Sequence, residues 1–140
     1  MAEAQVIVDT GPLVAFLVKE ETQHDWTEKQ FQQLPAPFLT CEPVLTETFF
    51  LVRNVPQGPS KFFALVNSGL LRTEFSLIRE GISVEKLIHK YADVPMSLTD
   101  ACLVRLAELN AESLIFTLDG DFRIYRKHGR RTIPTVMPPK

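Results

Sequence analysis

Hydrophobic residues occur along the chain in short runs that predict alternating strands and helices. The run at residues 6–8 is β-branched and contains no polar residue, which is typical of a strand buried on both faces. Asp9 follows it, Gly11 would permit a tight turn, and Pro12 suits the first turn of a helix that continues over residues 13–18. Asp9 is therefore predicted at the carboxyl end of a buried strand, where open α/β sheets bind their ligands.

The rest of the chain continues this alternation. Further helices are predicted at residues 24–33, 43–53, 60–68, 77–91 and 100–110. Strands are predicted at residues 38–40, 70–73 and 114–116, with an edge strand at 133–137 that a proline interrupts. Strands that alternate with helices indicate a parallel sheet covered on both faces. We therefore expect an α/β protein, a three-layer α/β/α sandwich with a central parallel sheet of about five strands, formed by residues 1–140 as one domain.

Composition narrows the class of protein. Hydrophobic residues make up 45% of the chain, which excludes a disordered protein. The apolar runs are too short to cross a membrane and no signal-peptide pattern opens the sequence, so we expect a cytoplasmic protein without a membrane partner. Cys41 and Cys102 fall within predicted helical segments, lack zinc-site spacing and are expected to be reduced thiols.

Charge is nearly balanced over the whole chain but not locally. A formal net charge of −2 does not produce a strong field that attracts nucleic acid over the whole surface. Between Arg123 and Arg131, however, six of nine residues are Arg, Lys or His.

Glu47 stands out among the acidic residues. At 100° per residue it falls between Phe50 and Leu51 on its predicted helix, away from Thr46 and Arg53. We therefore expect a glutamate on a buried apolar face, where an unpaired carboxylate is costly. The alternative is a salt bridge or a helix edge that reaches solvent.

Two further aspartates have ordinary structural explanations when each is taken alone. Ser97 and Asp100 are spaced as in a capping box, and Asp119 lies in a turn rich in Asp and Gly. Taken together with Asp9, however, they predict a cluster, because Asp9 and Asp119 both follow buried strands at one edge of the sheet. Clustered carboxylates repel unless a cation neutralises them, and oxygen ligands suit Mg²⁺ or Mn²⁺ rather than zinc. Such sites hydrolyse phosphate esters.

In these motifs the sequence resembles the PIN-domain family, notably VapC-like ribonuclease toxins. Residues 8–17, Val-Asp-Thr-Gly-Pro-Leu-Val-Ala-Phe-Leu, resemble the family's opening strand and helix, and Thr-Glu-Thr around Glu47 matches the acid of its third helix. Ser-Leu-Thr-Asp-Ala at 97–101 and Thr-Leu-Asp-Gly-Asp-Phe at 117–122 resemble its third and fourth motifs. Each motif is weak alone, but four in the right order over nearly the whole chain are fairly specific.

The resemblance implies a Mg²⁺- or Mn²⁺-dependent endoribonuclease that cleaves RNA phosphodiester bonds by metal-activated water, leaving a 3′-hydroxyl and a 5′-phosphate. The acids carried over as catalytic and metal-site residues are Asp9, Glu47, Asp100 and Asp119. Supporting polar neighbours are Thr10 and Thr117, and Asp121 is either a further ligand or a solvent-facing residue. The residues expected to hold the RNA backbone are Arg123, Arg126, Lys127, Arg130 and Arg131. Their alternative interpretation is a solvated helix and turn.

The resemblance also implies partners. It suggests the toxin of a type II toxin–antitoxin pair and leaves open whether a cognate antitoxin exists. A homodimer is expected, because the helix at 24–33 and the segment at 60–71 carry more apolar side chains than a small sheet needs. These side chains are Trp26, Phe31, Phe62, Phe63 and Leu65. The alternative is that they complete the core.

Two other classes of function remain as alternatives. One is a non-catalytic PIN-like module that binds RNA or protein, against which the intact set of four acids argues. The other is a phosphoryl-transfer protein of haloacid-dehalogenase or receiver type. That class needs a lysine after a late strand, whereas Lys127 lies in the basic run.

Overall fold

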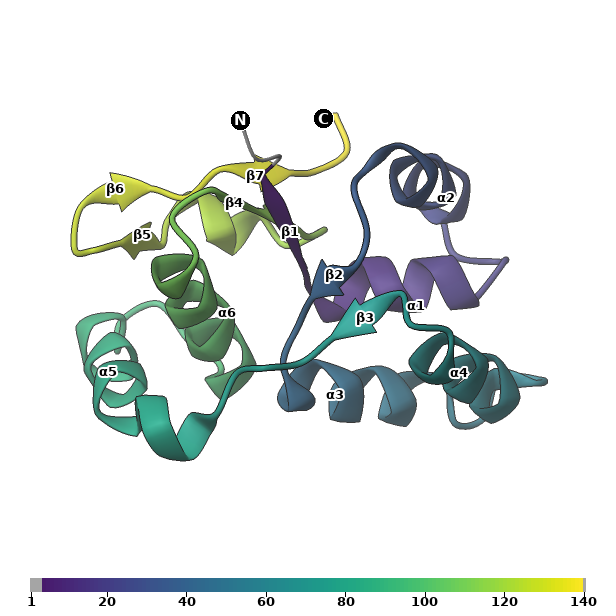
Figure 1. Ribbon diagram of the computed structural model, residues 1–140, viewed down its shortest axis with the longest axis horizontal. Coiled ribbons are helices and arrows are strands. Elements are labelled where there is room, and N and C mark those ends of the chain that lie inside the picture. Colours follow the sequence, from purple (N-terminus) through teal and green to yellow (C-terminus); the bar gives the residue numbers. More distant parts are fainter. Residues whose placement is uncertain (1–3, 140) are drawn as a thin grey trace.

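The apolar run of residues 6–8 forms the centre of the sheet. In a computed structural model that describes residues 4–139, strand β1 (Gln5–Val8) pairs on both sides with parallel neighbours, and its three apolar residues are fully buried (Figure 1). The sheet has the order β3-β2-β1-β4-β7, and every pairing within it is parallel. The other strands are β2 (Phe38–Leu39), β3 (Leu71–Arg72), β4 (Ser113–Phe116) and β7 (Thr135–Val136). The predicted five-stranded parallel sheet is confirmed.

Six α-helices flank this sheet within the described residues, close to their predicted positions. They are α1 (Thr10–Leu17), α2 (His24–Gln33), α3 (Glu42–Val52), α4 (Gly58–Asn67), α5 (Leu77–Lys90) and α6 (Leu98–Leu109). Helix α1 packs against α2 and α3, and α5 packs against α6. Figure 1 shows α5 and α6 together on one side of β1 and α1, α2 and α4 on the other. The predicted α/β sandwich is confirmed, and Met1–Glu3 and Lys140 of the predicted domain lie outside the described residues.

Most of the five apolar residues expected at a dimer interface complete the core instead. The Phe31 ring lies 5.1 Å from that of Phe116, and the Trp26 ring lies 5.8 Å from the same side chain. Phe62 and Leu65 are 6% exposed, whereas Phe63 is 51% exposed. The alternative interpretation therefore holds for four of the five residues, and the homodimer stays a prediction that rests on Phe63.

The basic segment, residues 123–131, has three exposed arginines, as the alternative interpretation expects, but it also contains a hairpin that was not predicted. It forms a short 3₁₀ helix, η1 (Gly120–Arg123), and then an antiparallel hairpin of β5 (Arg126–Lys127) and β6 (Arg131–Thr132). The hairpin turn contains His128 and Gly129, both with positive φ. Two-residue strands carry too little alternation to be predicted from hydrophobic pattern.

Two local predictions near the sheet edge are wrong. Gly11 makes no tight turn but lies in the first turn of α1, where an added Cβ would meet Leu118 at 3.3 Å. Its missing side chain therefore allows the helix to approach that residue closely. Cys41 is the N-cap of α3 rather than a residue inside a helix, whereas Cys102 lies within α6. Both cysteines are buried free thiols. No helix in residues 4–139 is long and apolar enough to cross a membrane.

Candidate active site

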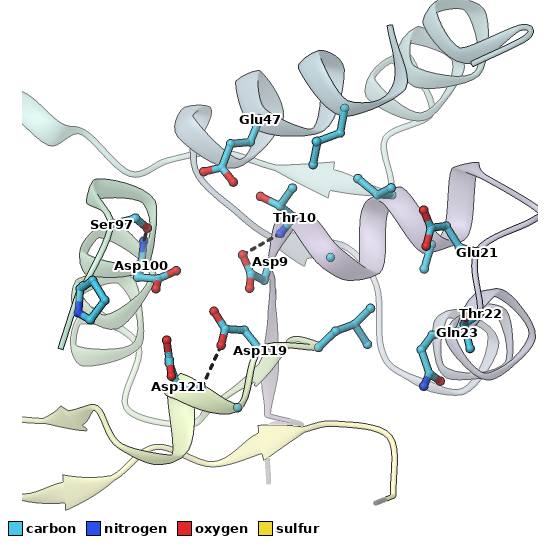
Figure 2. Close-up of a pocket in the computed structure, with 17 residues that line it drawn as sticks. Asp9, Thr10, Glu21, Thr22, Gln23, Glu47, Ser97, Asp100, Asp119 and Asp121 are labelled. Carbon is cyan, nitrogen blue, oxygen red and sulfur yellow. Dashed lines mark hydrogen bonds between the residues drawn. The ribbon is translucent and has the colours of Figure 1, made fainter. Parts of the chain in front are cut away.

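A cleft of about 760 Å³ lies at the carboxyl edge of the sheet and collects the predicted acids. Asp9 comes from the end of β1, Asp100 from the first turn of α6, and Asp119 from the segment after β4. Figure 2 shows these three aspartates and Asp121 facing a common space, with Glu47 of α3 on the far side. Four separate elements thus bring their carboxylates to one cleft, as the order of the motifs predicts.

Asp9 is the most deeply placed of these acids. It is 7% exposed and forms the N-cap of α1, where its Oδ1 accepts a 2.7 Å hydrogen bond from the Thr10 amide. The Thr117 hydroxyl donates to its Oδ2, also at 2.7 Å. The pKa of Asp9 is raised from 3.8 to about 6, mainly by burial; these two hydrogen bonds oppose the rise, and the neighbouring charges of Asp100 and Asp119 add to it. Asp9 therefore carries an unfavourable charge that a cation would relieve.

Thr117 connects two of the acids. Its fully buried hydroxyl donates to Asp9 and accepts a 2.9 Å hydrogen bond from the Asp119 amide. Asp119 in turn caps the 3₁₀ helix, because its Oδ1 accepts a 2.9 Å bond from the Asp121 amide. The turn interpretation of Asp119 is thus correct locally, and the same turn directs its carboxylate to the cleft.

Asp100 is only partly explained by helix capping. The Ser97 hydroxyl accepts a 3.0 Å hydrogen bond from the Asp100 amide, as a capping residue should. The Asp100 carboxylate, however, accepts a 2.9 Å hydrogen bond from the hydroxyl of Tyr125. Partial burial raises the pKa of Asp100, and this hydrogen bond opposes that rise. The carboxylate is therefore held at the cleft by a residue that lies far along the chain.

Glu47 reaches the cleft without being buried. It is exposed, and its neighbours Phe50 and Leu51 are 57% and 53% exposed. The helical spacing grouped these three residues correctly, but their face borders a cleft rather than the core, so the expected burial is wrong. The Thr99 hydroxyl donates a hydrogen bond to Oε2 of Glu47. Helix α6 thereby fixes an acid of α3 in position.

Every predicted acid thus has a hydrogen-bond donor that orients it. The orienting side chains are Thr117, Thr99 and Tyr125. Of these, only Thr117 was predicted from the sequence. Thr99 adjoins Asp100 within the Ser-Leu-Thr-Asp motif, so its place near the acids could have been predicted. No spacing in the sequence identifies Tyr125 as a partner of Asp100.

The donor set fits a hard divalent cation. The cleft offers carboxylate oxygens, which suit Mg²⁺ or Mn²⁺, and the Thr10 hydroxyl beside Asp9 is buried without a hydrogen-bond partner. Such an unpartnered polar atom at the edge of the cleft fits a site that receives a further polar ligand. Within residues 4–139 no three acidic, His or Cys side chains form a ready-made ligand group. Mg²⁺ needs only one or two carboxylates, because it retains several waters and binds substrate phosphate oxygens.

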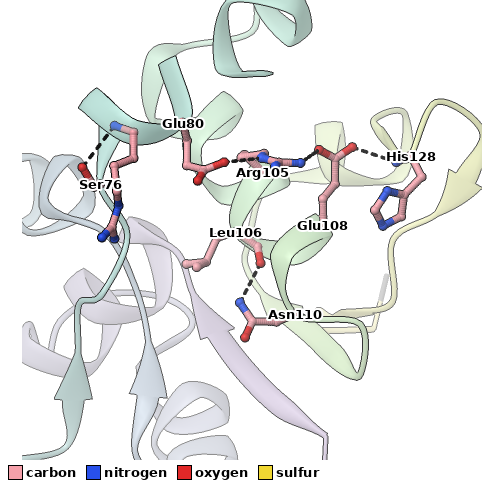
Figure 3. Close-up of polar contacts among 8 residues, drawn as sticks. Ser76, Glu80, Arg105, Leu106, Glu108, Asn110 and His128 are labelled. Carbon is pink, nitrogen blue, oxygen red and sulfur yellow. Dashed lines mark hydrogen bonds and ion pairs between the residues drawn. The ribbon is translucent and has the colours of Figure 1, made fainter. Parts of the chain in front are cut away.

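The basic segment lies beside this cleft and is firmly anchored. The hydroxyl of Tyr91 accepts a hydrogen bond from the Arg126 amide, and Lys90 donates to the Gly129 carbonyl. Figure 3 shows a series of polar contacts that connects the hairpin turn to α6 and α5. Glu108 accepts a 2.7 Å hydrogen bond from the His128 amide, and Arg105 forms ion pairs with both Glu108 and Glu80.

The five basic residues of this segment differ in their contacts. Arg126 donates to three backbone carbonyls, and Lys127 is 8% exposed and donates to the Ala111 carbonyl. Arg123, Arg130 and Arg131 are exposed. The position of Lys127 also leaves it outside the lining of the cleft, which argues against the phosphoryl-transfer alternative.

Comparison with known proteins identifies the fold. No family model matches the sequence, and no curated protein matches it. Among solved structures, the chain is similar to the crystal structure of Mycobacterium tuberculosis VapC20, described as a toxin that cleaves the sarcin–ricin loop. The TM-score is 0.76 at 22% sequence identity, covering 91% of this chain and 99% of VapC20. The fold is therefore that of a VapC-like PIN domain, as the sequence motifs predicted.

Proposed function

We propose that this protein is a metal-dependent endoribonuclease that hydrolyses RNA phosphodiester bonds. The observation that carries the proposal is the convergence of Asp9, Glu47, Asp100 and Asp119 from four elements on one cleft, each oriented by a hydrogen-bond donor. A merely structural role for these acids does not account for their meeting, since clustered carboxylates oppose one another. The VapC-like fold supports the same function.

The residues have distinct roles in this proposal. Asp9, Asp100 and Asp119 would hold one or two Mg²⁺ or Mn²⁺ ions, and Glu47 would hold the second ion or orient the attacking water. The bound cation supplies the positive charge that activates water and stabilises the leaving oxygen. Thr117, Thr99 and Tyr125 act through the acids, because their hydroxyl groups direct the carboxylates of Asp9, Glu47 and Asp100, respectively, into the cleft. The exposed Arg123, Arg130 and Arg131 would contact the RNA backbone.

The partners follow from the same assignment. VapC20 is described as cleaving the sarcin–ricin loop, which supports a structured RNA as the substrate of this chain. A toxin of this kind would be paired with a cognate antitoxin protein and would act in the cytoplasm. A homodimer would bury Phe63, which is the exposed member of the apolar set on α4.

Cleavage of a mixed RNA pool tests the proposal. Wild type, Asp100→Asn and the matched control Asp93→Asn, whose carboxylate is exposed outside the cleft, are incubated with end-labelled ribosomal and messenger RNA in Mn²⁺ or in EDTA. We expect cleavage by wild type and the control in Mn²⁺, none in EDTA, and loss of cleavage in Asp100→Asn. Binding of RNA without cleavage by wild type would overturn the proposal and favour the non-catalytic module.

A further inference from the structure

The cleft extends well beyond the acids along helix α1. Besides the carboxylates, it is lined by apolar side chains of α1, α3 and the segment before Asp119: Val14, Leu51 and Leu118. Its far end is closed by the connection between α1 and α2, at Glu21, Thr22 and Gln23. Figure 2 shows these last three residues at the opposite end of the cleft from Asp100 and Asp119. We call this apolar part, with its polar end, the side slot.

Neither metal binding nor phosphate hydrolysis requires such a slot. Leu51 lies one helical turn beyond Glu47, lines the cleft and is 53% exposed. Gly11 lets α1 approach Leu118 closely, and Leu118 lines the same cleft as Leu51. An apolar lining next to a polar end suits a group with apolar faces and a polar edge.

The charge of the cleft selects the part of an RNA that can enter. Glu21 adds a further acid to those of the cleft, so a second phosphate is repelled from the slot. A nucleobase is neutral, and enzymes that act on unstacked nucleotides hold the base between apolar or aromatic side chains. The exposed Arg130 and Arg131 lie on the hairpin of β5 and β6, and Figure 2 shows the hairpin on the other side of the acids. The backbone and the base would thus leave the acidic site in different directions.

The polar end of the slot can read the edge of a base. Gln23 is the N-cap residue of α2, yet its side chain makes no capping hydrogen bond, so its amide group is available. The carboxylate of Glu21 can only accept hydrogen bonds, which favours a base that presents an amino group.

We propose that the side slot binds the unstacked base of the nucleotide next to the scissile phosphate and prefers adenine, cytosine or guanine to uracil. Leu51 and Leu118 would contact the faces of the base, and Glu21 and Gln23 would bind its edge. The position of the phosphate rests on the nuclease function proposed above, but the slot itself can be tested without cleavage.

Titration with the four nucleosides in EDTA tests the slot directly, because nucleosides carry no phosphate and need no metal. The signals observed are the methyl resonances of Val14, Leu51 and Leu118 in wild type, and those of Val14 and Leu118 in Leu51→Ala. The matched control is Leu109→Ala, since Leu109 is 46% exposed but lies outside the cleft. We expect adenosine, cytidine and guanosine to shift these signals more than uridine, and Leu51→Ala to weaken binding at least about tenfold. Absence of nucleoside shifts in wild type, or equal affinity in Leu51→Ala, would overturn the slot even if the protein cleaves RNA.

A second arm examines base selection during cleavage of a randomised RNA. Gln23→Leu should change the base preference at one position beside the cleavage site, whereas Gln33→Leu, an exposed glutamine at the other end of α2, should not. An unchanged preference in Gln23→Leu contradicts the proposal. If the protein binds nucleosides but cleaves no RNA, the slot is supported and the nuclease function is rejected. Failure of the slot and failure of the nuclease function are therefore distinguishable.

Discussion

The hydroxyl group of Tyr125 donates a 2.9 Å hydrogen bond to Oδ2 of Asp100, which connects the basic segment to the acidic cleft. Tyr125 is fully buried, and its ring is held edge to face by Tyr91 at 5.1 Å and Phe122 at 5.3 Å. The orientation of a carboxylate in the acidic cleft therefore depends on how the segment after β4 packs.

Tyr125→Phe should weaken the site without unfolding the protein. The ring is retained, but Asp100 loses the hydrogen bond that orients it and opposes the rise in its pKa. We expect a loss of about tenfold or more in Mn²⁺ affinity and in cleavage rate. Calorimetric titration with Mn²⁺ measures the first effect. Tyr91→Phe is the control, since Tyr91 accepts a hydrogen bond from the Arg126 amide and makes no bond to Asp100. Equal losses of Mn²⁺ affinity and cleavage rate in Tyr125→Phe and Tyr91→Phe would show that Tyr125 does not orient Asp100.

Asp9→Asn should stabilise the protein at neutral pH in EDTA. Burial raises the pKa of Asp9 from 3.8 to about 6, so the folded state disfavours the ionised form. Ionised Asp9 therefore lowers the free energy of unfolding, with no effect below about pH 4 and the full effect above pH 6. A pKa shift of this size corresponds to roughly 3 kcal/mol. Urea denaturation at pH 7.5 and at pH 4 should therefore show a gain in the free energy of unfolding at the higher pH only. A variant that is less stable than wild type at pH 7.5 would contradict this electrostatic account.

The exposed arginines and the buried lysine of the basic segment should behave differently. Replacing Arg130 and Arg131 by alanine should weaken RNA binding and reduce the slope of log affinity against log salt by about 1.4, or 0.7 for each single-strand phosphate contact. Lys127→Ala should instead lower the free energy of unfolding, because its ammonium group donates to the Ala111 carbonyl. Salt-dependent fluorescence anisotropy measures the binding effect, and urea denaturation measures the stability effect. An unchanged slope in the double variant would exclude these arginines from the RNA surface.

The sequence predicted the elements whose signal is local. The β-branched run before Asp9 identified the central strand, and the positions of the acids after strands and at helix starts predicted their convergence. Helical spacing placed Glu47 with Phe50 and Leu51 correctly, yet it could not distinguish a face that meets the core from one that borders a cleft.

Features that depend on long-range packing were missed. The contact of Tyr125 with Asp100 spans 25 residues and follows no repeating pattern. The hairpin strands have two residues each, too few for alternation to be visible. For Trp26 and Phe31 the sequence left a dimer interface and the core as alternatives, and only the long-range contact of both rings with Phe116 decides for the core.

The central claim is that the four acids form one catalytic site, and Glu47 tests it most directly. Glu47 is exposed and Glu47→Gln keeps its shape, so the fold should be unaffected. Glu42→Gln on the same helix is the matched control, because Glu42 is also exposed but lies outside the cleft. Circular dichroism verifies folding of both variants.

The measurement is single-turnover cleavage of a labelled single-stranded RNA in Mn²⁺ by wild type, Glu47→Gln and Glu42→Gln. We expect Glu47→Gln to be slower by about a hundredfold or more, because it loses the charge that binds metal or orients water, while Glu42→Gln keeps the wild-type rate. A folded Glu47→Gln protein that cleaves at the wild-type rate would contradict the four-acid site.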